Sequence, residues 1–422
     1  MGNSAPHVKP GSSGAVSDPR NYLQYDLPKF IIQKKMGAGK FMKAFLCKVE
    51  EGVPMVVKVY VKHDGETDEA LLRAKEGVEE IQTRLNPYDH PNVLPYQSSV
   101  VGAQRSGRFT GAGYLLRQHF YTSLYDRLST RPFLSTVEKK WIVYQLFKAL
   151  IQCHDSGVCH GDIKSENVMV TSWTWIILTD FASFKPTYLP EDDPTDFNHY
   201  FASAEHGQHR CYLAPERFYS SSAEAETQGM LGGLDPAAAT AADQSKAPAG
   251  LPRSATAARR KEGPLQPSMD VFSLGCVIAE VFLGSAVLDL PLLLQYRSAA
   301  EGEQEATLAK VNKIEVPSVK NLVLNMLQRE PSSRKTVAEY LERCETTDID
   351  QYGGKLFPPC FGTFVFDFFT MLQREVHTPD DRIMLVCSEY GTILREMAGT
   401  TDAEGEAFFA HFPPVPFSGD GL

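Results

Sequence analysis

The chain has few of the features that mark secreted, metal-bound or membrane-spanning proteins. Its eight cysteines form no CxxC pair, so neither a zinc site nor a disulfide framework is indicated, and reduced thiols in a cytosolic protein are the simplest interpretation. No apolar run approaches the roughly 18 to 20 residues of a membrane-spanning helix, and the N-terminus lacks a secretory signal. Basic residues are in the minority, 42 against 52 acidic ones, and the net charge of −10 argues against a nucleic-acid partner.

The segment from His160 to Asn167 combines a carboxylate, a lysine and an amide at short spacing. Transfer of a γ-phosphoryl group needs a carboxylate to accept the proton of the attacking hydroxyl, oxygen ligands for Mg²⁺ and a cation for the developing charge. Asp162 can be the catalytic base and Lys164 the nearby cation. Asn167 and Asp180 can be the metal ligands. The alternative is that Asp162 and Asp180 are ordinary solvated loop acids, which the ordered set of motifs disfavours.

The sequence between these groups predicts that the two metal ligands meet. Two β-prone runs, 168–170 and 176–179, are separated by five residues and predict a hairpin. Asn167 and Asp180 stand at its two open ends and should therefore lie close together in space.

Upstream, residues 36–44 resemble a glycine-rich strand-turn-strand that covers nucleotide phosphates. Alone they also fit a plain turn, but their distance from the strand 55–59 favours the nucleotide role. Lys58 in that strand is predicted to bind the phosphates, although a solvent-facing lysine is the alternative. The predicted nucleotide-binding residues are Met36, Gly37, Ala38, Gly39, Lys40, Phe41, Met42, Ala44 and Lys58.

Apolar residues at helical spacing predict a helix over residues 66–85. We expect a glutamate on this helix to pair with Lys58. Glu76 and Glu79 both lie near the edge of the apolar stripe, and the sequence does not choose between them.

Three further residues are predicted to support the site. A helix is expected from Ser268, with that serine as its cap. Asp270 on this helix is placed to brace the segment around Asp162 from behind. Arg334 is the expected buried ion-pair partner of Glu216, although either side chain could be exposed.

These ordered segments resemble the eukaryotic protein kinases, and 422 residues with 43% hydrophobic content suffice for their α+β fold of two lobes plus extensions. The composition assigns residues 1–24 to a disordered leader and 219–267 to a disordered, low-complexity insert. The small β-rich N-lobe is predicted over 25–118 and the mainly helical C-lobe over 119–345. Residues 346–422 are a C-terminal extension.

The resemblance narrows to one family. The chain resembles the phosphoinositide 3-kinase regulatory subunit 4 family, which comprises the vacuolar protein-sorting serine/threonine kinases of the class III phosphatidylinositol 3-kinase complex. The resemblance rests on the runs 158–201 and 124–134, the start at Gly2 and the unusual Gly161 and Ala182. The likeness extends to about residue 396, and the extension resembles the entry to a helical-repeat region that is missing here.

The resemblance implies a regulatory or scaffold subunit that works with ATP and Mg²⁺, GTP not being excluded. The implied partners are the class III phosphatidylinositol 3-kinase catalytic subunit and a Beclin-type subunit. N-myristoylation of Gly2 is expected to bring a cytoplasmic protein to endosomal and autophagic membranes. The motif at Gly2 is imperfect, because Pro6 stands where serine or threonine is favoured.

Three departures from ordinary kinases bear on turnover. Gly161 replaces the arginine that commonly receives an activation-loop phosphate, Ala182 replaces a glycine, and His209 stands where a threonine usually steadies the base. The leading hypothesis is an atypical serine/threonine protein kinase serving the lipid-kinase complex in autophagy and vacuolar sorting. The alternatives are a pseudokinase scaffold that only binds nucleotide, and a free cytosolic kinase unrelated to lipid signalling.

Overall fold

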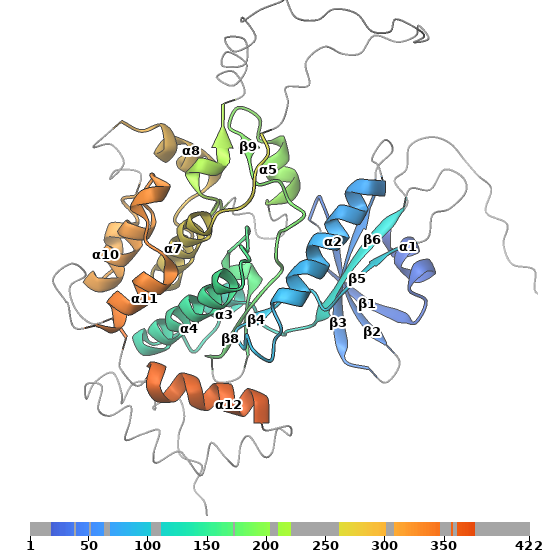
Figure 1. The fold of residues 1–422 in the computed structure, drawn as a ribbon, viewed down its shortest axis with the longest axis horizontal. Coiled ribbons are helices and arrows are strands. Elements are labelled where there is room, and N and C mark those ends of the chain that lie inside the picture. The colour runs from blue at the N-terminus through green and yellow to red at the C-terminus, as the bar shows by residue number, and fades with distance from the viewer. Residues whose placement is uncertain are drawn as a thin grey trace, which may run out of the picture.

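The computed structural model describes residues 18–37, 39–49, 52–62, 68–102, 111–171, 174–202, 210–220, 261–300, 308–346, 356–357 and 361–375. They form a small lobe built on a β-sheet and a larger helical lobe, side by side (Figure 1). The predicted α+β, two-lobed fold class is confirmed. Among these residues, the structure contains no helix with the length and apolar character that crossing a bilayer requires.

The N-lobe is a five-stranded antiparallel sheet in the order β1-β2-β3-β6-β5. Its strands are β1 (Phe30–Gly37), β2 (Lys43–Val49), β3 (Pro54–Val61), β5 (Ser98–Val101) and β6 (Ala112–Gln118). In the central strand β3, Val57 and Val59 point into the apolar core. Since successive side chains of a strand point to opposite faces, Lys58 points the other way, toward the C-lobe.

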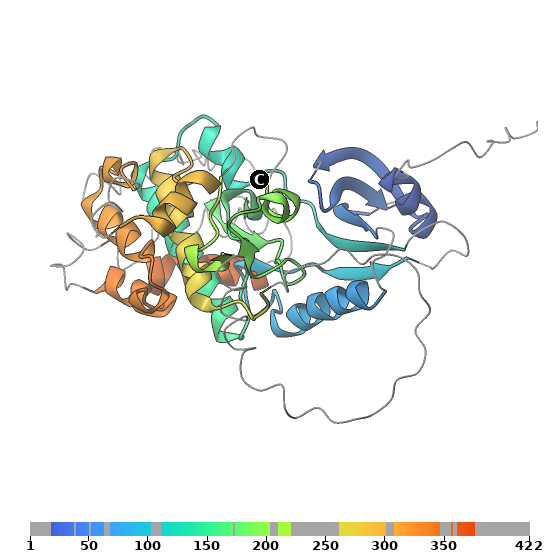
Figure 2. The same ribbon diagram turned by 90° about the horizontal axis from the view of Figure 1, so that it is seen from above.

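Two helices cover this sheet. Helix α1 (Pro19–Asp26) buries Tyr22 and Leu23 in the sheet's core cluster, so the predicted disordered leader over 1–24 is wrong for its last residues. Residues 1–17, with Gly2, lie outside the described chain. Helix α2 (Asp68–Arg84) lies along the sheet beside β5 and β6 and buries the predicted apolar stripe (Figure 2).

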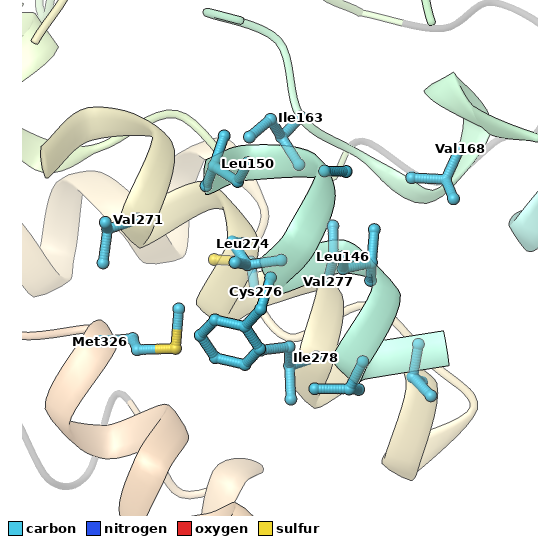
Figure 3. Packing of buried hydrophobic residues seen from close by; sticks show 14 of the residues in the cluster. Leu146, Leu150, Ile163, Val168, Val271, Leu274, Cys276, Val277, Ile278 and Met326 are labelled. Carbon is cyan, nitrogen blue, oxygen red and sulfur yellow. The ribbon is translucent and has the colours of Figure 1, made fainter. Parts of the chain in front are cut away.

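The C-lobe is organised around two buried helices, α4 (Thr136–Asp155) and α7 (Pro267–Leu283), whose leucines and valines interlock (Figure 3). Helix α7 starts one residue before the predicted cap: Gln266 is its N-cap and Pro267 its first residue, so the serine-cap prediction is wrong. The remaining helices are α3 (Leu124–Ser129), α5 (Thr195–Tyr200), α8 (Leu290–Ser298), α10 (Pro317–Met326), α11 (Val337–Glu345) and α12 (Asp367–Glu375). Short turns of helix are η1 (Ser165–Asn167), η3 (Pro215–Arg217), η4 (Val311–Lys313), η5 (Pro331–Ser333) and η6 (Phe361–Phe366).

Short strands line the junction between the lobes. The predicted hairpin is present as β7 (Val168–Val170) paired with β8 (Ile176–Thr179), and β4 (Val93–Leu94) adds to β8. Strands β9 (Leu189–Pro190) and β10 (Phe218–Tyr219) pair farther along. The predicted insert over 219–267 therefore begins within β10, and its residues 221–260 lie outside the described chain.

The C-terminal extension contributes to the C-lobe core. Phe361 and Phe369 contact the ring of Trp141 in α4, and Phe366 stacks on Trp175. Helix α12 thus lies against the lower face of the C-lobe, near α4 (Figure 1).

Candidate active site

The segment around His160 is held from behind by Asp270 of α7. The Asp270 carboxylate accepts hydrogen bonds from the backbone N–H of His160 at 2.7 Å and of Gly161 at 2.9 Å, which is the bracing role predicted for it. Burial lowers the pKa of His160, so the imidazole is neutral. It donates from Nε2 to the carbonyl of Thr179 and accepts from the N–H of Asp162. These contacts fix the direction of the Asp162 side chain.

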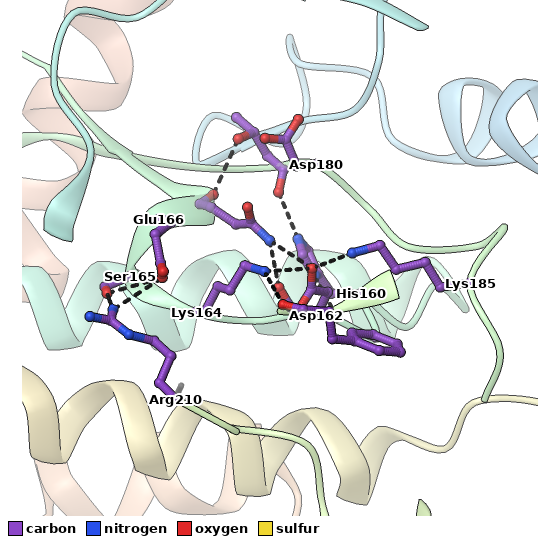
Figure 4. A network of polar contacts seen from close by, with 12 residues as sticks. His160, Asp162, Lys164, Ser165, Glu166, Asp180, Lys185 and Arg210 are labelled. Carbon is purple, nitrogen blue, oxygen red and sulfur yellow. Dashed lines mark hydrogen bonds and ion pairs between the residues drawn. The ribbon is translucent and has the colours of Figure 1, made fainter. Parts of the chain in front are cut away.

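Asp162 is buried and bonded to two lysines (Figure 4). Its Oδ2 lies 3.2 Å from Lys164 Nζ and 2.7 Å from Lys185 Nζ. Burial alone would raise the pKa of Asp162, but the charges of both lysines outweigh it and lower the pKa, so the group stays ionised. Asn167 Nδ2 donates to the Asp162 backbone carbonyl at 2.7 Å. The predicted base, cation and amide therefore lie together, and Lys185 is an addition to them.

Asp180 receives two cations as well. Lys58 Nζ lies 3.1 Å from its Oδ2, and Arg117 donates to both oxygens, from Nε at 2.8 Å and from Nη2 at 3.0 Å. Burial alone would raise the pKa of Asp180, but Arg117 and then Lys58 hold it well below its usual range. The backbone of Asp180 is left-handed, with φ of 66°, a conformation that aspartate tolerates better than most residues. The β8 strand thus ends in a carboxylate whose charge is already compensated.

The expected pairing of Lys58 with a glutamate of α2 is wrong. Glu79 instead lies 3.4 Å from Lys75 and accepts from the Ser99 hydroxyl, and both Glu76 and Glu79 are exposed. Asp180 is the nearer carboxylate for Lys58, and it is buried, where an uncompensated charge would cost most.

The glycine-rich turn joins β1 to β2 and closes over this region. Gly39 accepts from Lys43 Nζ at 2.6 Å, and Phe41 packs against Phe184 and Tyr200 of the C-lobe, with ring centroids 5.8 and 4.7 Å apart. Met36 lies in β1 and Lys40 is exposed, whereas Ala38 falls outside the described residues.

A cavity of about 260 Å³ joins the two clusters. Its walls come from the glycine-rich turn, β3, the segment after His160, the segment after Asp180 and α5. Of the predicted site residues it is lined by Gly37, Gly39, Phe41, Met42, Ala44, Lys58, Asp162, Lys164, Asn167 and Asp180, while Met36 and Lys40 do not line it.

A second layer of ion pairs supports the C-lobe side. Arg334 donates from its two Nη atoms to the two oxygens of Glu216, at 2.7 and 2.9 Å, as the sequence predicted. Arg217 is fully buried and donates to the carbonyl of Gly161 at 2.7 Å. Gly161 has φ of 77°, a left-handed conformation that disfavours the arginine found there in ordinary kinases.

The sequence reasoning missed Arg117 and Lys185. Arg117 is the penultimate residue of β6, and its guanidinium is turned into the site. One signal was available: a lone arginine directly after the apolar run 114–116. Lys185 carried no such signal, because only the path of the chain after Asp180 brings it back to Asp162. His209 lies outside the described residues.

The residues expected to hold Mg²⁺ fit it poorly as they are arranged. The Asn167 amide nitrogen is bonded to Asp162, so the amide oxygen is the atom of this side chain that can bind a cation. Both Asp180 oxygens, however, are bonded to Arg117, and Lys58 adds a second positive charge. A divalent ion at Asp180 would meet two cations at close range. Nucleotide phosphates fit better, because Lys58, Lys164 and Lys185 all line the cavity.

Comparison with known proteins agrees with this geometry. Residues 30–228 match the protein kinase domain family. The chain is 39% identical over 381 residues to the serine/threonine-protein kinase VPS15 of Arabidopsis thaliana, which covers 89% of this chain and 22% of that protein. It is 37% identical over 374 residues to a probable serine/threonine-protein kinase vps15 of Dictyostelium discoideum, a match that covers 88% of this chain and 16% of that protein. For the serine/threonine-protein kinase VPS15 of Saccharomyces cerevisiae the identity is 36% over 343 residues, and the match covers 80% of this chain and 20% of that protein. The chain spans about a fifth of the length of the curated relatives it matches.

Proposed function

We propose that this chain is a nucleotide-binding serine/threonine kinase domain of a regulatory subunit. It belongs to the VPS15 family of serine/threonine-protein kinases and corresponds to their kinase portion. Protein kinase domains use ATP and Mg²⁺ in general, and this chain carries one. The subunit would serve the class III phosphatidylinositol 3-kinase complex in vacuolar sorting and autophagy.

One observation supports the nucleotide-binding part above all. Four polar side chains from three separate segments, Lys58, Asp162, Asn167 and Asp180, line one cavity between the lobes, and Lys58 lies 3.1 Å from Asp180. Burial of these charges is costly, and only a ligand of complementary charge gives the arrangement a use beyond folding.

A second candidate is the pseudokinase scaffold, which holds nucleotide without transferring phosphate. Lys185 favours it, because a lysine 2.7 Å from Asp162 occupies the carboxylate that a substrate hydroxyl would need. For phosphate transfer, the substrate hydroxyl has to reach a carboxylate oxygen of Asp162 in competition with the lysine at Oδ2.

The partners and location belong to the same proposal. The proposed partners are the class III phosphatidylinositol 3-kinase catalytic subunit and a Beclin-type subunit, as the resemblance of the sequence implies. Myristoylation at Gly2 would add a membrane contact, and a single myristoyl chain binds only marginally, so partner contacts have to supply the rest. We place the protein in the cytoplasm, peripheral on endosomal and autophagic membranes.

Phosphate transfer is tested with the full chain, radiolabelled ATP and a generic protein substrate. We expect Asp162→Ala to lower phosphorylation of the substrate and of the chain itself at least about 100-fold, since it removes the general base. Asp155→Ala, at the exposed end of α4, is the matched control and should equal wild type. Equal phosphorylation by wild type and Asp162→Ala would rule out the kinase activity and leave the scaffold candidate.

A further inference from the structure

Arg117 binds Asp180, the carboxylate that was expected to bind Mg²⁺. It is the penultimate residue of β6, where the N-lobe sheet leads into the connection between the lobes, and only 6% of it is exposed. Its Nε and Nη2 bind the two oxygens of Asp180 as a fork, the geometry in which arginine binds a carboxylate most firmly. A third donor, Nη1, reaches the carbonyl of Gln118 at 3.0 Å and fixes the guanidinium plane.

This contact competes with a metal for the same carboxylate. Mg²⁺ needs oxygen ligands at close range in near-octahedral geometry. Asp180 offers two oxygens, and both already accept charge-assisted hydrogen bonds from Arg117, with Lys58 on the second one. A divalent ion would have to displace the guanidinium or sit beside it at a large electrostatic cost.

The cations of the site supply the charge that a divalent ion would bring. One cluster contains Lys58, Arg117 and Asp180, and the other contains Lys164, Lys185 and Asp162, so each has two cations and one carboxylate. Each cluster is therefore formally positive by one charge. Glu166, the remaining acid of the cavity wall, is paired with Arg210 at 3.1 Å.

We propose that Arg117 makes this a metal-independent nucleotide site, in which the polyphosphate of a nucleoside triphosphate is held by the lysines while Arg117 occupies Asp180 in place of Mg²⁺. The inference rests on the nucleotide binding proposed above and specifies how it is achieved. It also predicts a site suited to holding a nucleotide more than to transferring its phosphate, because no metal orients the γ-phosphate.

The test measures the affinity of the full chain for ATP and for GTP by thermal stabilisation and equilibrium dialysis, in Mg²⁺ and in EDTA. For wild type we expect the two dissociation constants to agree within about twofold for the nucleotide that binds. In Arg117→Met, Asp180 loses its fork, and we expect affinity in EDTA to fall about tenfold or more below that in Mg²⁺. Arg131→Met, in the exposed loop after α3, is the matched control and should behave as wild type.

Each possible result either supports or contradicts the inference. A wild-type affinity that drops more than about twofold in EDTA overturns the inference while leaving nucleotide binding intact. Equal affinities in both conditions for Arg117→Met also overturn it, because the arginine would then not be the cause. No binding of either nucleotide in any condition removes the proposed nucleotide function itself. Lys58→Ala, which loses a phosphate-binding cation, should abolish binding in both conditions.

A folding defect in Arg117→Met does not block the test. Arg117→Lys keeps the charge but has a single donor centre in place of the fork, so an intermediate dependence on Mg²⁺ is expected. The wild-type ratio alone still overturns the inference if it exceeds the limit above.

Discussion

The two buried carboxylates that line the site cavity are each matched by two cations rather than one. Asp162 has Lys164 and Lys185, and Asp180 has Lys58 and Arg117. The surplus positive charge is not needed to stabilise the fold, since one partner would compensate each carboxylate. It is the electrostatic environment that an anionic ligand requires.

Lys185 should lose its proton at a lower pH than an ordinary lysine. Burial lowers its pKa to about 8 against 10.5 for an ordinary lysine, although Asp162 opposes the change. Between these two values the unfolded chain keeps a proton that the folded chain has lost, so this group makes the free energy of unfolding rise with pH. We expect wild type to gain up to about 1.4 kcal/mol per pH unit relative to Lys185→Met between pH 8 and 10, measured by urea unfolding.

The control for this titration is Lys29→Met, an exposed lysine before β1, which should keep the wild-type slope. Parallel pH curves for wild type and Lys185→Met would show that Lys185 keeps its proton in the folded state. The pairing with Asp162 would then be stronger than its burial implies.

At the scale of the element, helix α1 is the feature that the local composition did not predict. It contains only eight residues, and it follows a leader rich in glycine, serine and proline. A short helix of this kind is not stable in isolation. Its capping aspartate, Asp18, accepts from Arg20 N–H at 3.0 Å, and Tyr22 and Leu23 are buried against the sheet, so tertiary packing stabilises it.

Removal of the α1 anchor should therefore weaken the N-lobe. Leu23 is fully buried, and Leu23→Ala is expected to lower the free energy of unfolding by about 2–5 kcal/mol through lost burial and a cavity. Gln24→Ala, exposed on the same helix, should change it by less than about 0.5 kcal/mol. Denaturant unfolding followed by circular dichroism compares the two. An equal, small effect of both substitutions would mean that α1 does not support the sheet.

At the scale of the whole molecule, an aromatic contact joins the lobes. Phe41 of the glycine-rich turn contacts Phe184, which follows Asp180, and both His199 and Tyr200 of α5. These residues line the cavity that contains both carboxylates. The turn and α5 are therefore in direct contact beside the site.

Loss of this contact should loosen the turn and α5. An aromatic pair contributes about 1 kcal/mol beyond burial, so Phe41→Ala should speed hydrogen exchange of the turn and of α5 about fivefold. Phe133→Ala, with 61% of the side chain exposed in the loop before α4, is the control and should leave both segments unchanged. Unaltered exchange in Phe41→Ala would mean that other contacts hold the lobes closed.

Much of the fold followed from the sequence because its signals are local. The hairpin of β7 and β8, the helix α2 and the strand with Lys58 were predicted from apolar period and turn residues. The placement of Asn167 and Asp180 in one cavity, and the pair of Glu216 with Arg334, followed from motif order in a fold of known kind. Residue spacing along the chain is enough for such inferences, since period and order do not depend on distant contacts.

Only the tertiary structure decided which charges pair. The sequence offered Glu76 and Glu79 to Lys58, but the folded chain gives it Asp180, and it brings Arg117 and Lys185 to carboxylates 63 and 23 residues away. The physical reason is that a charge pairs with whatever opposite charge lies within a few ångströms and away from water. Sequence patterns specify the faces of helices and strands, whereas the burial and the distance that select a partner arise when the lobes pack.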